Sequence, residues 1–217
     1  MPDIVASGTD GSNGINGTPG NAGAAGQPGA NGIDHWNGDD PPGNGETGHN
    51  GQDGSPGTAG QNGSSGSNIT IEVDDFVVGL NVNTHGGAGG IGGSGGAGGA
   101  GGPGGVGGTP ADEGDRHGNG GNGGNGGLGG GGASGGRGGD GGSITIVANR
   151  ITTGTLHAAA EGGRGGLGGA AGPGGGAGPG GNGWRQGPNG EVGPNGATGP
   201  TGARGLDGSV DIIQRAP

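Results

Sequence analysis

The stretch "HGGAGGIGGSGGAGGAGGPGGVGGTP", from His85 to Pro110, has two glycines in every three residues. Glycine is costly to order, because it loses more backbone freedom on folding than any other residue. Of the 217 residues 77 are Gly, hydrophobic residues make up 23%, and the chain has no Tyr and one Phe. This composition is too poor in apolar side chains for an ordinary globular core and on its own indicates disorder.

Glycine nevertheless keeps a three-residue register through six glycine-rich segments, numbered 1 to 6 in chain order. Segments 1, 2 and 6 have Gly at every third position, whereas segments 3, 4 and 5 have Gly at two of every three, apart from Ala133, Ala171 and Ala177. The segments span residues 8–32, 45–66, 86–108, 118–142, 162–181 and 187–208. A flexible linker has no reason to keep register over about 25 residues.

A period of three is the period of the extended polyproline II helix, which has no internal hydrogen bonds. A row of glycines on such a helix is a bare strip of backbone, which can approach a neighbour until N–H meets C=O. We therefore predict an antiparallel six-rod polyglycine II or polyproline II bundle with few or no α-helices. Segments 3, 4 and 5, with two glycine rows, are predicted to be inner rods.

An intermolecular collagen triple helix is the main alternative, because segments 1, 2 and 6 follow the Gly-X-Y pattern. Collagen-like chains have roughly 15–20% Pro or more, whereas this chain has 14 Pro among 217 residues. A second glycine row would also waste conformational entropy in a triple helix. The composition therefore favours one folded chain.

The joints between segments reveal a longer repeat. The joint at 67–85 contains "NITIEVDDFVVGLNVN" and the joint at 143–161 contains "SITIVANRITTGTLHA", so that Ile69 aligns with Ile144. Both alternate apolar and polar residues around a break, which is typical of strand–turn–strand. Residues 209–217 match the first half of a joint. These matches predict three pseudo-repeats of about 75 residues.

The N-terminal residues 1–7 resemble the second half of a joint. We therefore expect the strand Ile4–Ala6 to pair with Val210–Ile213 and close a small β layer at one end of the rods. The alternative is that the two termini are unrelated, frayed ends.

Rods that alternate in direction bring the other three connections together at the opposite end, about 60–75 Å from the β layer. These connections are the tip loops 33–44, 109–117 and 182–186. Loops on a rigid scaffold are where binding residues collect, and Trp with Arg is typical of interface hot spots. The candidate ligand-binding residues are Asp34, His35, Trp36, Asp39, Asp40, Asp115, Arg116, His117, Trp184 and Arg185.

The arrangement of glycine-rich rods and terminal loops resembles the receptor-binding tip adhesins on the tail fibres of T-even-like phages. That resemblance covers the segments and the position of the loops, and it implies stacked polyglycine II rods with host specificity in the loops. The β joints have no counterpart in that family. The chain also resembles springtail antifreeze proteins, which are bundles of polyproline II rods with Gly at every third residue, although it lacks their cysteines.

Several function classes are disfavoured. A net charge of −11 argues against nucleic acid as a partner, and no apolar run reaches the roughly 18 residues of a membrane span. No catalytic dyad, cofactor motif or zinc-ligand spacing is present, so we expect neither an enzyme nor a cofactor. The acids of loops 33–44 and 109–117 offer oxygen ligands for Ca²⁺, or simply face water; the metal question stays open.

We therefore expect a non-enzymatic structural and adhesion module, extracellular or on a virion surface. Its partner is a cell-surface glycan or protein receptor bound by the tip loops. One alternative is a subunit of an extracellular filament, built from copies of the chain by β-strand addition. Another is ice binding by the outward row of segment 3, from Ala88 to Thr109, although Ile91 and Pro103 make that row uneven. The N-terminal "MPDIVASG" has neither the basic nor the apolar region of a signal peptide, so we expect another export route or a leader already removed.

Overall fold

The computed structural model describes residues 3–76, 79–151 and 156–215. Within these ranges the regular elements are strands, and no helix is assigned; accordingly, no helix there is long and apolar enough to cross a membrane. The strands are β1 (Asp3–Val5), β2 (Ile69–Phe76), β3 (Leu80–Asn83), β4 (Ile144–Ile151), β5 (Leu156–Ala159) and β6 (Val210–Gln214).

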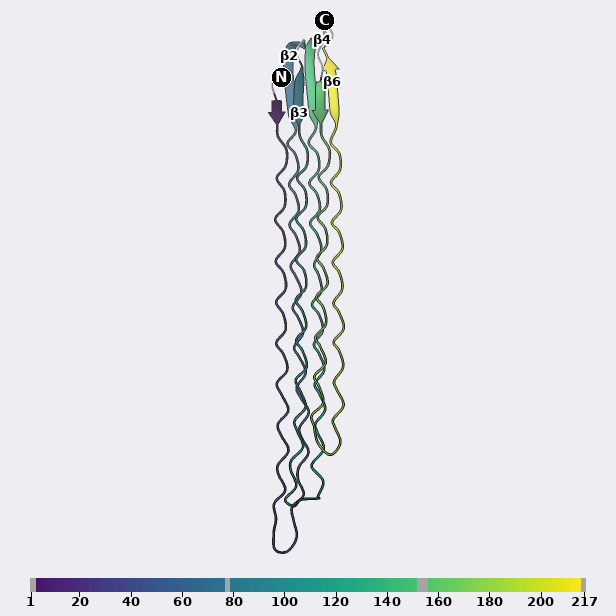
Figure 1. Cartoon of the computed structure of the whole chain (residues 1–217). Coiled ribbons are helices and arrows are strands. Elements are labelled where there is room, and N and C mark those ends of the chain that lie inside the picture. Colours follow the sequence, from purple (N-terminus) through teal and green to yellow (C-terminus); the bar gives the residue numbers. More distant parts are fainter. Residues whose placement is uncertain (1–2, 77–78, 152–155, 216–217) are drawn as a thin grey trace.

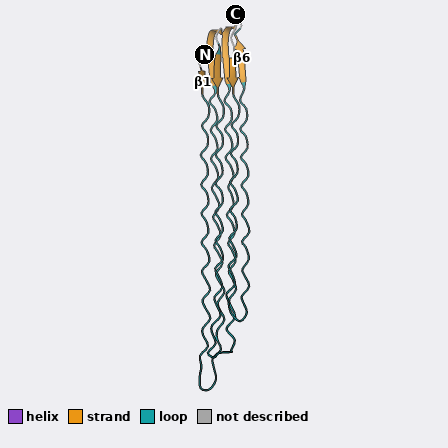
Figure 2. Cartoon of the chain, in the orientation of Figure 1, coloured by secondary structure: helices purple, strands orange, loops and turns teal. Residues whose placement is uncertain are grey.

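The strands form two sheets at one end of a long, narrow molecule (Figures 1 and 2). One sheet has the order β1-β3-β5 and the other β2-β4-β6, and every pairing is parallel. Strands β1, β3 and β5 lead into segments 1, 3 and 5, whereas β2, β4 and β6 follow segments 2, 4 and 6. The chain therefore leaves the sheet end in one layer and returns to it in the other.

The predicted fold class is wrong. We expected an antiparallel six-rod polyglycine II or polyproline II bundle with a single small β layer. The regular structure instead consists of two parallel three-stranded sheets. No regular element is assigned to the glycine-rich segments that lie between the strands in the sequence. The glycine register carries no information about the joints, where alternating Ile and Val make two apolar faces that must cover each other.

The expected pairing of strands is also wrong. Consecutive strands β2 and β3 lie in different sheets and do not form one layer, β1 pairs with β3, and β6 pairs with β4. The sequence pattern of strand, break and strand does not distinguish a hairpin from a corner between two facing sheets. The breaks themselves, at 77–78 and 152–155, lie outside the described residues.

A small hydrophobic core fills the space between the sheets. Ile144 and Ile146 on β4 are fully buried, and Val82 on β3 is 1% exposed. Ile144 is the register partner of Ile69 on one side and of Val210 on the other, so equivalent residues of the three repeats lie side by side. Full burial of such a side chain contributes about 1.5–3 kcal/mol. The core comprises Phe76, Leu80, Val82, Ile144, Ile146, Ala148 and Ala160.

Backbone hydrogen bonds between segments hold the long part of the molecule together. In segment 3, the N–H of Gly98 donates to the carbonyl of Pro173 in segment 5 (2.9 Å), which runs in the same direction. The next N–H, of Gly99, donates to the carbonyl of Gln52 in segment 2 (2.7 Å), which runs in the opposite direction. The same two bonds recur every three residues, so the extended backbone satisfies its polar groups without a helix or a sheet.

The number of glycine rows follows from the neighbours of each segment. One row faces the next segment: a Cβ on Gly98 would lie 2.1 Å from the carbonyl oxygen of Gly127 in segment 4. The other row faces the segment two earlier: a Cβ on Gly99 would lie 1.9 Å from the carbonyl oxygen of Asn21 in segment 1. Segments 1 and 2 have no segment two earlier and segment 6 has none after it, so each needs only one row.

Asn and Asp side chains satisfy many of the remaining amides. Asn13 Oδ1 accepts a hydrogen bond from the N–H of Ile91 (2.9 Å), and Asp53 Oδ1 accepts one from the N–H of Leu128 (2.7 Å). Both pairs join segments that run side by side in one layer. The frequent Asn and Asp residues therefore serve the backbone in addition to making the surface polar.

Candidate functional site

Three loops lie at the end of the molecule opposite the sheets (Figure 1). In the loop at 33–44, the N–H of Asp40 donates to the carbonyl of Ile33 (2.9 Å), and the N–H of Ile33 donates to the carbonyl of Asp40 (3.2 Å). This bridge closes a turn in which Gly38 has φ = 123°, a conformation that favours glycine. The turn presents Trp36, which is 97% exposed.

The same loop contains a contact between a histidine and a carboxylate. His35 Nε2 lies 3.3 Å from Asp40 Oδ2, with both side chains substantially exposed. The backbone N–H of His35 also donates to Asp39 Oδ1 at 3.4 Å. His35 therefore contacts two acids of its own loop, and these contacts link the two sides of the turn.

Three carboxylates from two loops come together beside this turn. Asp39, from the first loop, and Asp112 and Asp115, from the second, have oxygens within 4.8 Å of one another, and all three residues are exposed. The charge of Asp39 first, and that of Asp34 second, raises the pKa of Asp112 above its usual value of 3.8. Carboxylates of this kind bind Ca²⁺ in proteins, but an exposed acidic cluster does not by itself define a metal site. Its established effect is a concentrated negative charge.

The second and third loops are joined by a stacked pair. The guanidinium carbon of Arg116 lies 4.4 Å from the centre of the Trp184 ring. The N–H of Trp184 donates to the carbonyl of Gly118 (2.9 Å), which fixes the base of the third loop against segment 4. A cation–π contact at an exposed site contributes about 0.5–1 kcal/mol. Trp184 remains 53% exposed, so the ring is also available to a ligand.

A cleft of about 440 Å³ separates the first two loops. Proline rings make much of its wall, while carboxylates and one guanidinium provide its polar groups. The lining residues are Asp39, Asp40, Pro41, Pro42, Pro110, Ala111, Gly114, Asp115 and Arg116. An apolar wall with a few polar groups at its edge suits a sugar ring or an amphipathic side chain.

The structure brings some of the predicted site residues together and leaves others apart. Asp39, Asp40, Asp115 and Arg116 line the cleft, and Trp184 stacks on Arg116. The five remaining predicted residues do not line the cleft, although His35 contacts Asp40. They are Asp34, His35, Trp36, His117 and Arg185.

Sequence reasoning counted the acids of loop 109–117 as possible Ca²⁺ ligands but left Asp112 out of the candidate ligand-binding residues, and it missed the proline wall. The signal for the wall was present in "DDPP" and "TPAD", because Pro restricts the backbone and holds a loop in one shape. The position of Asp112 depends on the turn at Gly114, which has φ = 108°. That conformation cannot be read from loop composition.

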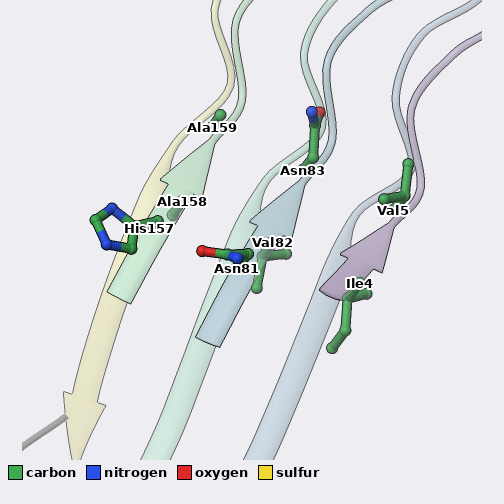
Figure 3. A pocket seen from close by; sticks show the side chains of 8 residues that line it. All are labelled: Ile4, Val5, Asn81, Val82, Asn83, His157, Ala158 and Ala159. Atoms are coloured by element: carbon green, nitrogen blue, oxygen red, sulfur yellow. The ribbon is translucent and has the colours of Figure 1, made fainter. Parts of the chain in front are cut away.

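A second hollow, of about 400 Å³, lies on the outer side of the β1-β3-β5 sheet (Figure 3). Asn81 and His157 project to the same side from neighbouring strands (Figure 3). Asn83 Oδ1 accepts hydrogen bonds from Ser7 Oγ (2.9 Å) and from the N–H of His85 (3.0 Å). The alternation in "LNVN" was the available signal, because it places both Asn residues on the face opposite Leu80 and Val82.

No protein-family model matches the sequence, and no curated protein matches it. Among solved structures, a springtail antifreeze protein from Granisotoma rainieri, described as a nine polyproline type II helical bundle, is 30% identical. The match covers 66% of this chain and 94% of that chain, with a TM-score of 0.16. A likeness at this TM-score does not establish a common fold, and this neighbour is not a tail-fibre adhesin.

Proposed function

We propose that this chain is a non-enzymatic adhesion module whose three terminal loops bind a receptor. The observation that carries the proposal is the stacking of Arg116 on Trp184 beside the cleft between loops 33–44 and 109–117. It joins residues from distant parts of the sequence into one exposed surface with aromatic, apolar and charged groups. Such a surface has the composition of a recognition site.

The glycine-rich segments support the assignment of binding to the loops. Along segments 3, 4 and 5 two of three rows are glycine apart from Ala133, Ala171 and Ala177, because a Cβ at the glycines of these rows would meet a backbone oxygen at about 2 Å. These segments have little freedom to encode a ligand, whereas most positions of the loops accommodate varied side chains. A cell-surface glycan or a protein receptor is the proposed partner. The proposed setting is extracellular or on a virion surface, as in a fibre tip.

The test is the loss of binding in Trp184→Ala, which removes the ring of the stacked pair beside the cleft. The full chain is screened against immobilised cell-surface glycans and surface proteins, and the variant is compared on the best binder. We expect at least a tenfold loss of affinity, equivalent to about 1.4 kcal/mol, and a loss of stability of no more than about 0.5–1 kcal/mol, the value of an exposed cation–π contact, because Trp184 is 53% exposed. Ile15→Ala, at a residue 74% exposed on segment 1, is the matched control. Equal binding by all three proteins contradicts the proposal.

Ice binding is a second candidate, favoured by one surface. The outward rows of segments 1, 3 and 5 lie side by side and carry no charge from Asn13 to Asn31, from Ile91 to Thr109 and from Leu167 to Asn182. The opposite face carries Asp53, Arg137 and Glu191. Small, uncharged groups in regular rows are what a surface needs to order water like ice. Shaping of ice crystals by the protein, abolished by Ala100→Lys, would support this candidate, and unshaped growth would eliminate it.

A further inference from the structure

The sides of the glycine-rich stack are closed to a second copy. A further segment could pack beside segment 6 only if segment 6 had a row of glycines facing it. Segment 4 has such a row facing segment 5: a Cβ on Gly120 would lie closer to the carbonyl oxygen of Gly181 than any real contact. Segment 6 instead carries Asn, Val, Thr, Arg and Asp at these positions. They are Asn189, Val192, Asn195, Thr198, Thr201, Arg204 and Asp207. A second copy therefore cannot continue the stack beside segment 6 with the packing that joins the segments of one chain.

The sheet end is different, because β6 is an edge strand with an uncovered apolar face. Val210 and Ile212 are register partners of Ile144 and Ile146. The residues on β4 are 0% exposed, whereas Val210 is 43% and Ile212 51% exposed. These side chains occupy core positions at which the facing sheet has ended. An exposed edge strand with apolar residues invites pairing with another strand.

The backbone of β6 presents its free groups at the same residues. The carbonyl of Ser209 accepts a hydrogen bond from the N–H of Ile144, and the N–H of Arg215 donates one to the carbonyl of Ala148. Because backbone groups alternate in direction along a strand, the odd-numbered residues of β6 face β4. The N–H and C=O of Val210, Ile212 and Gln214 therefore face the open edge.

The other edge of this sheet is protected against its own copy. The N–H of Ile69 donates to the carbonyl of Ser143, so the backbone groups of Ile69 face β4. Because these groups alternate in direction along a strand, the N–H and C=O of Thr70, Glu72 and Asp74 face the outer edge of β2. Antiparallel self-pairing there would place acidic side chains opposite or next to their own copies, which is destabilising. Acidic residues on an edge strand are a common protection against association.

We infer that β6 is a self-association surface, and that two copies of this chain pair antiparallel through it around a two-fold axis at Ile212. In this register Ile212 faces Ile212 of the other copy, and Val210 faces Gln214. In both of these pairs each residue directs its N–H and C=O toward the open edge. The two residues of a pair can therefore exchange the two hydrogen bonds of an antiparallel sheet. The inference is independent of the proposed adhesive function.

The charges and the overall shape agree with this register. On one face of the paired strands Asp211 lies diagonally across from both Asp211 and Arg215 of the other copy, so the two carboxylates near the axis are flanked by two guanidinium groups. Each Arg215 also pairs with Glu72 of its own sheet (2.9 Å). Strands 209–215 carry no net charge in a chain with a net charge of −11. Antiparallel pairing also points the glycine-rich stacks of the two copies away from each other, so the side chains on segment 6 cause no clash. The interface is isologous and closes at a dimer.

The test measures the mass and length of the full chain in solution. Sedimentation is expected to show a rise from 19.4 kDa toward twice that mass as the concentration increases. Small-angle scattering is expected to show that the maximum dimension about doubles on dimerisation. An extended threefold backbone rises about 3.1 Å per residue, so each stack adds an arm of about 75 Å. A monomer at every concentration, or a dimer as short as the monomer, overturns the inference.

Three variants identify the interface. Ile212→Asp places two carboxylates at the axis and is expected to abolish the dimer with the circular dichroism spectrum unchanged, since Ile212 is half exposed. Val5→Asp makes the same kind of change on β1, at a residue 71% exposed, and is expected to leave the dimer intact. Val210→Asp, opposite Gln214 of the other copy, is likewise expected to abolish the dimer, because Val210 is 43% exposed at the same edge. Loss of association in both Ile212→Asp and Val5→Asp, with larger oligomers in the wild type, indicates a β1-to-β6 filament and overturns the dimer.

Discussion

A Cβ placed on Gly98 would lie 2.1 Å from the carbonyl oxygen of Gly127 in the adjacent segment. No side chain fits at that distance, so even the smallest substitution must push two backbones apart. The N–H of Gly98 donates to the carbonyl of Pro173 in a third segment (2.9 Å). A displacement at this one residue therefore disturbs three segments, because the same glycine links them.

Gly98→Val is predicted to destabilise the protein by several kcal/mol. The substitution separates segments 3 and 4 and leaves buried backbone groups without partners, at about 1–3 kcal/mol for each group. Ala100→Val changes an exposed residue on the same segment and is predicted to be nearly silent. Thermal unfolding of the two variants and the wild type checks this. Identical melting of all three would mean that the segments are not in contact.

Thr84→Val is predicted to cost about 1–3 kcal/mol. Thr84 is fully buried where β3 ends, and its Oγ1 donates to the carbonyl of Gly142 (2.9 Å). Valine has nearly the same shape but no hydroxyl, so the carbonyl of Gly142 loses this donor inside the protein. Thr70→Val, on the exposed face of β2, is the matched control. Chemical denaturation measures the difference, and equal stability of the two variants would refute the role given to this hydrogen bond.

The acidic cluster at the loops predicts a dependence on pH. The folded state raises the pKa of Asp112 through repulsion by Asp39 and Asp34. Stability from this group is therefore fully present below its unfolded pKa, near 3.8, and is lost as the pH rises through the folded pKa. Asp112→Asn is predicted to raise the melting temperature at pH 7 but not at pH 3. A melting temperature that rises equally at both pH values would show that charge repulsion is not the cause.

Asp140 is predicted to have the opposite effect. Hydrogen bonds from the N–H of Leu206 and from Arg137 hold the pKa of Asp140 below its usual value of 3.8. Its stabilising contribution is present above the unfolded pKa and is lost as the pH falls through the folded pKa. Asp140→Asn is therefore predicted to lower the melting temperature at pH 7 and to have less effect at pH 2. An equal effect at both pH values would contradict the assignment.

The sequence predicted which residues face a neighbouring segment but not which neighbour they face. A three-residue register looks the same after a shift of three, so nothing within segments 2 and 4 selects one alignment. The strands select it, because Ile69 must lie beside Ile144 for both to reach the core. The existence of two sheets was missed for a related reason: alternation in β2 and β3 predicts strands and faces, but not which strand covers which.

The candidate site was predictable in location and only partly in membership. Trp, Arg and acidic residues stand out in loops 33–44 and 109–117 because the segments around them are monotonous. Whether two such residues meet depends on backbone turns, such as that at Gly114, and on the stagger of the loops. Arg116 and Trp184 meet for this reason, whereas Trp36 projects alone.

The contact between Arg116 and Trp184 predicts a measurable coupling between two loops. The guanidinium lies 4.4 Å from the ring centre, and a partly exposed cation–π pair of this kind contributes about 0.5–1 kcal/mol. In a double-mutant cycle, Arg116→Gln and Trp184→Leu are each predicted to lower stability slightly, and the double variant to lower it by less than their sum. The cycle isolates the pair, because any loss of packing by Trp184 alone cancels. Repeating the cycle with receptor affinity as the readout tests whether the stacked pair also orients the binding surface; additivity in the stability cycle would show that the two loops are independent.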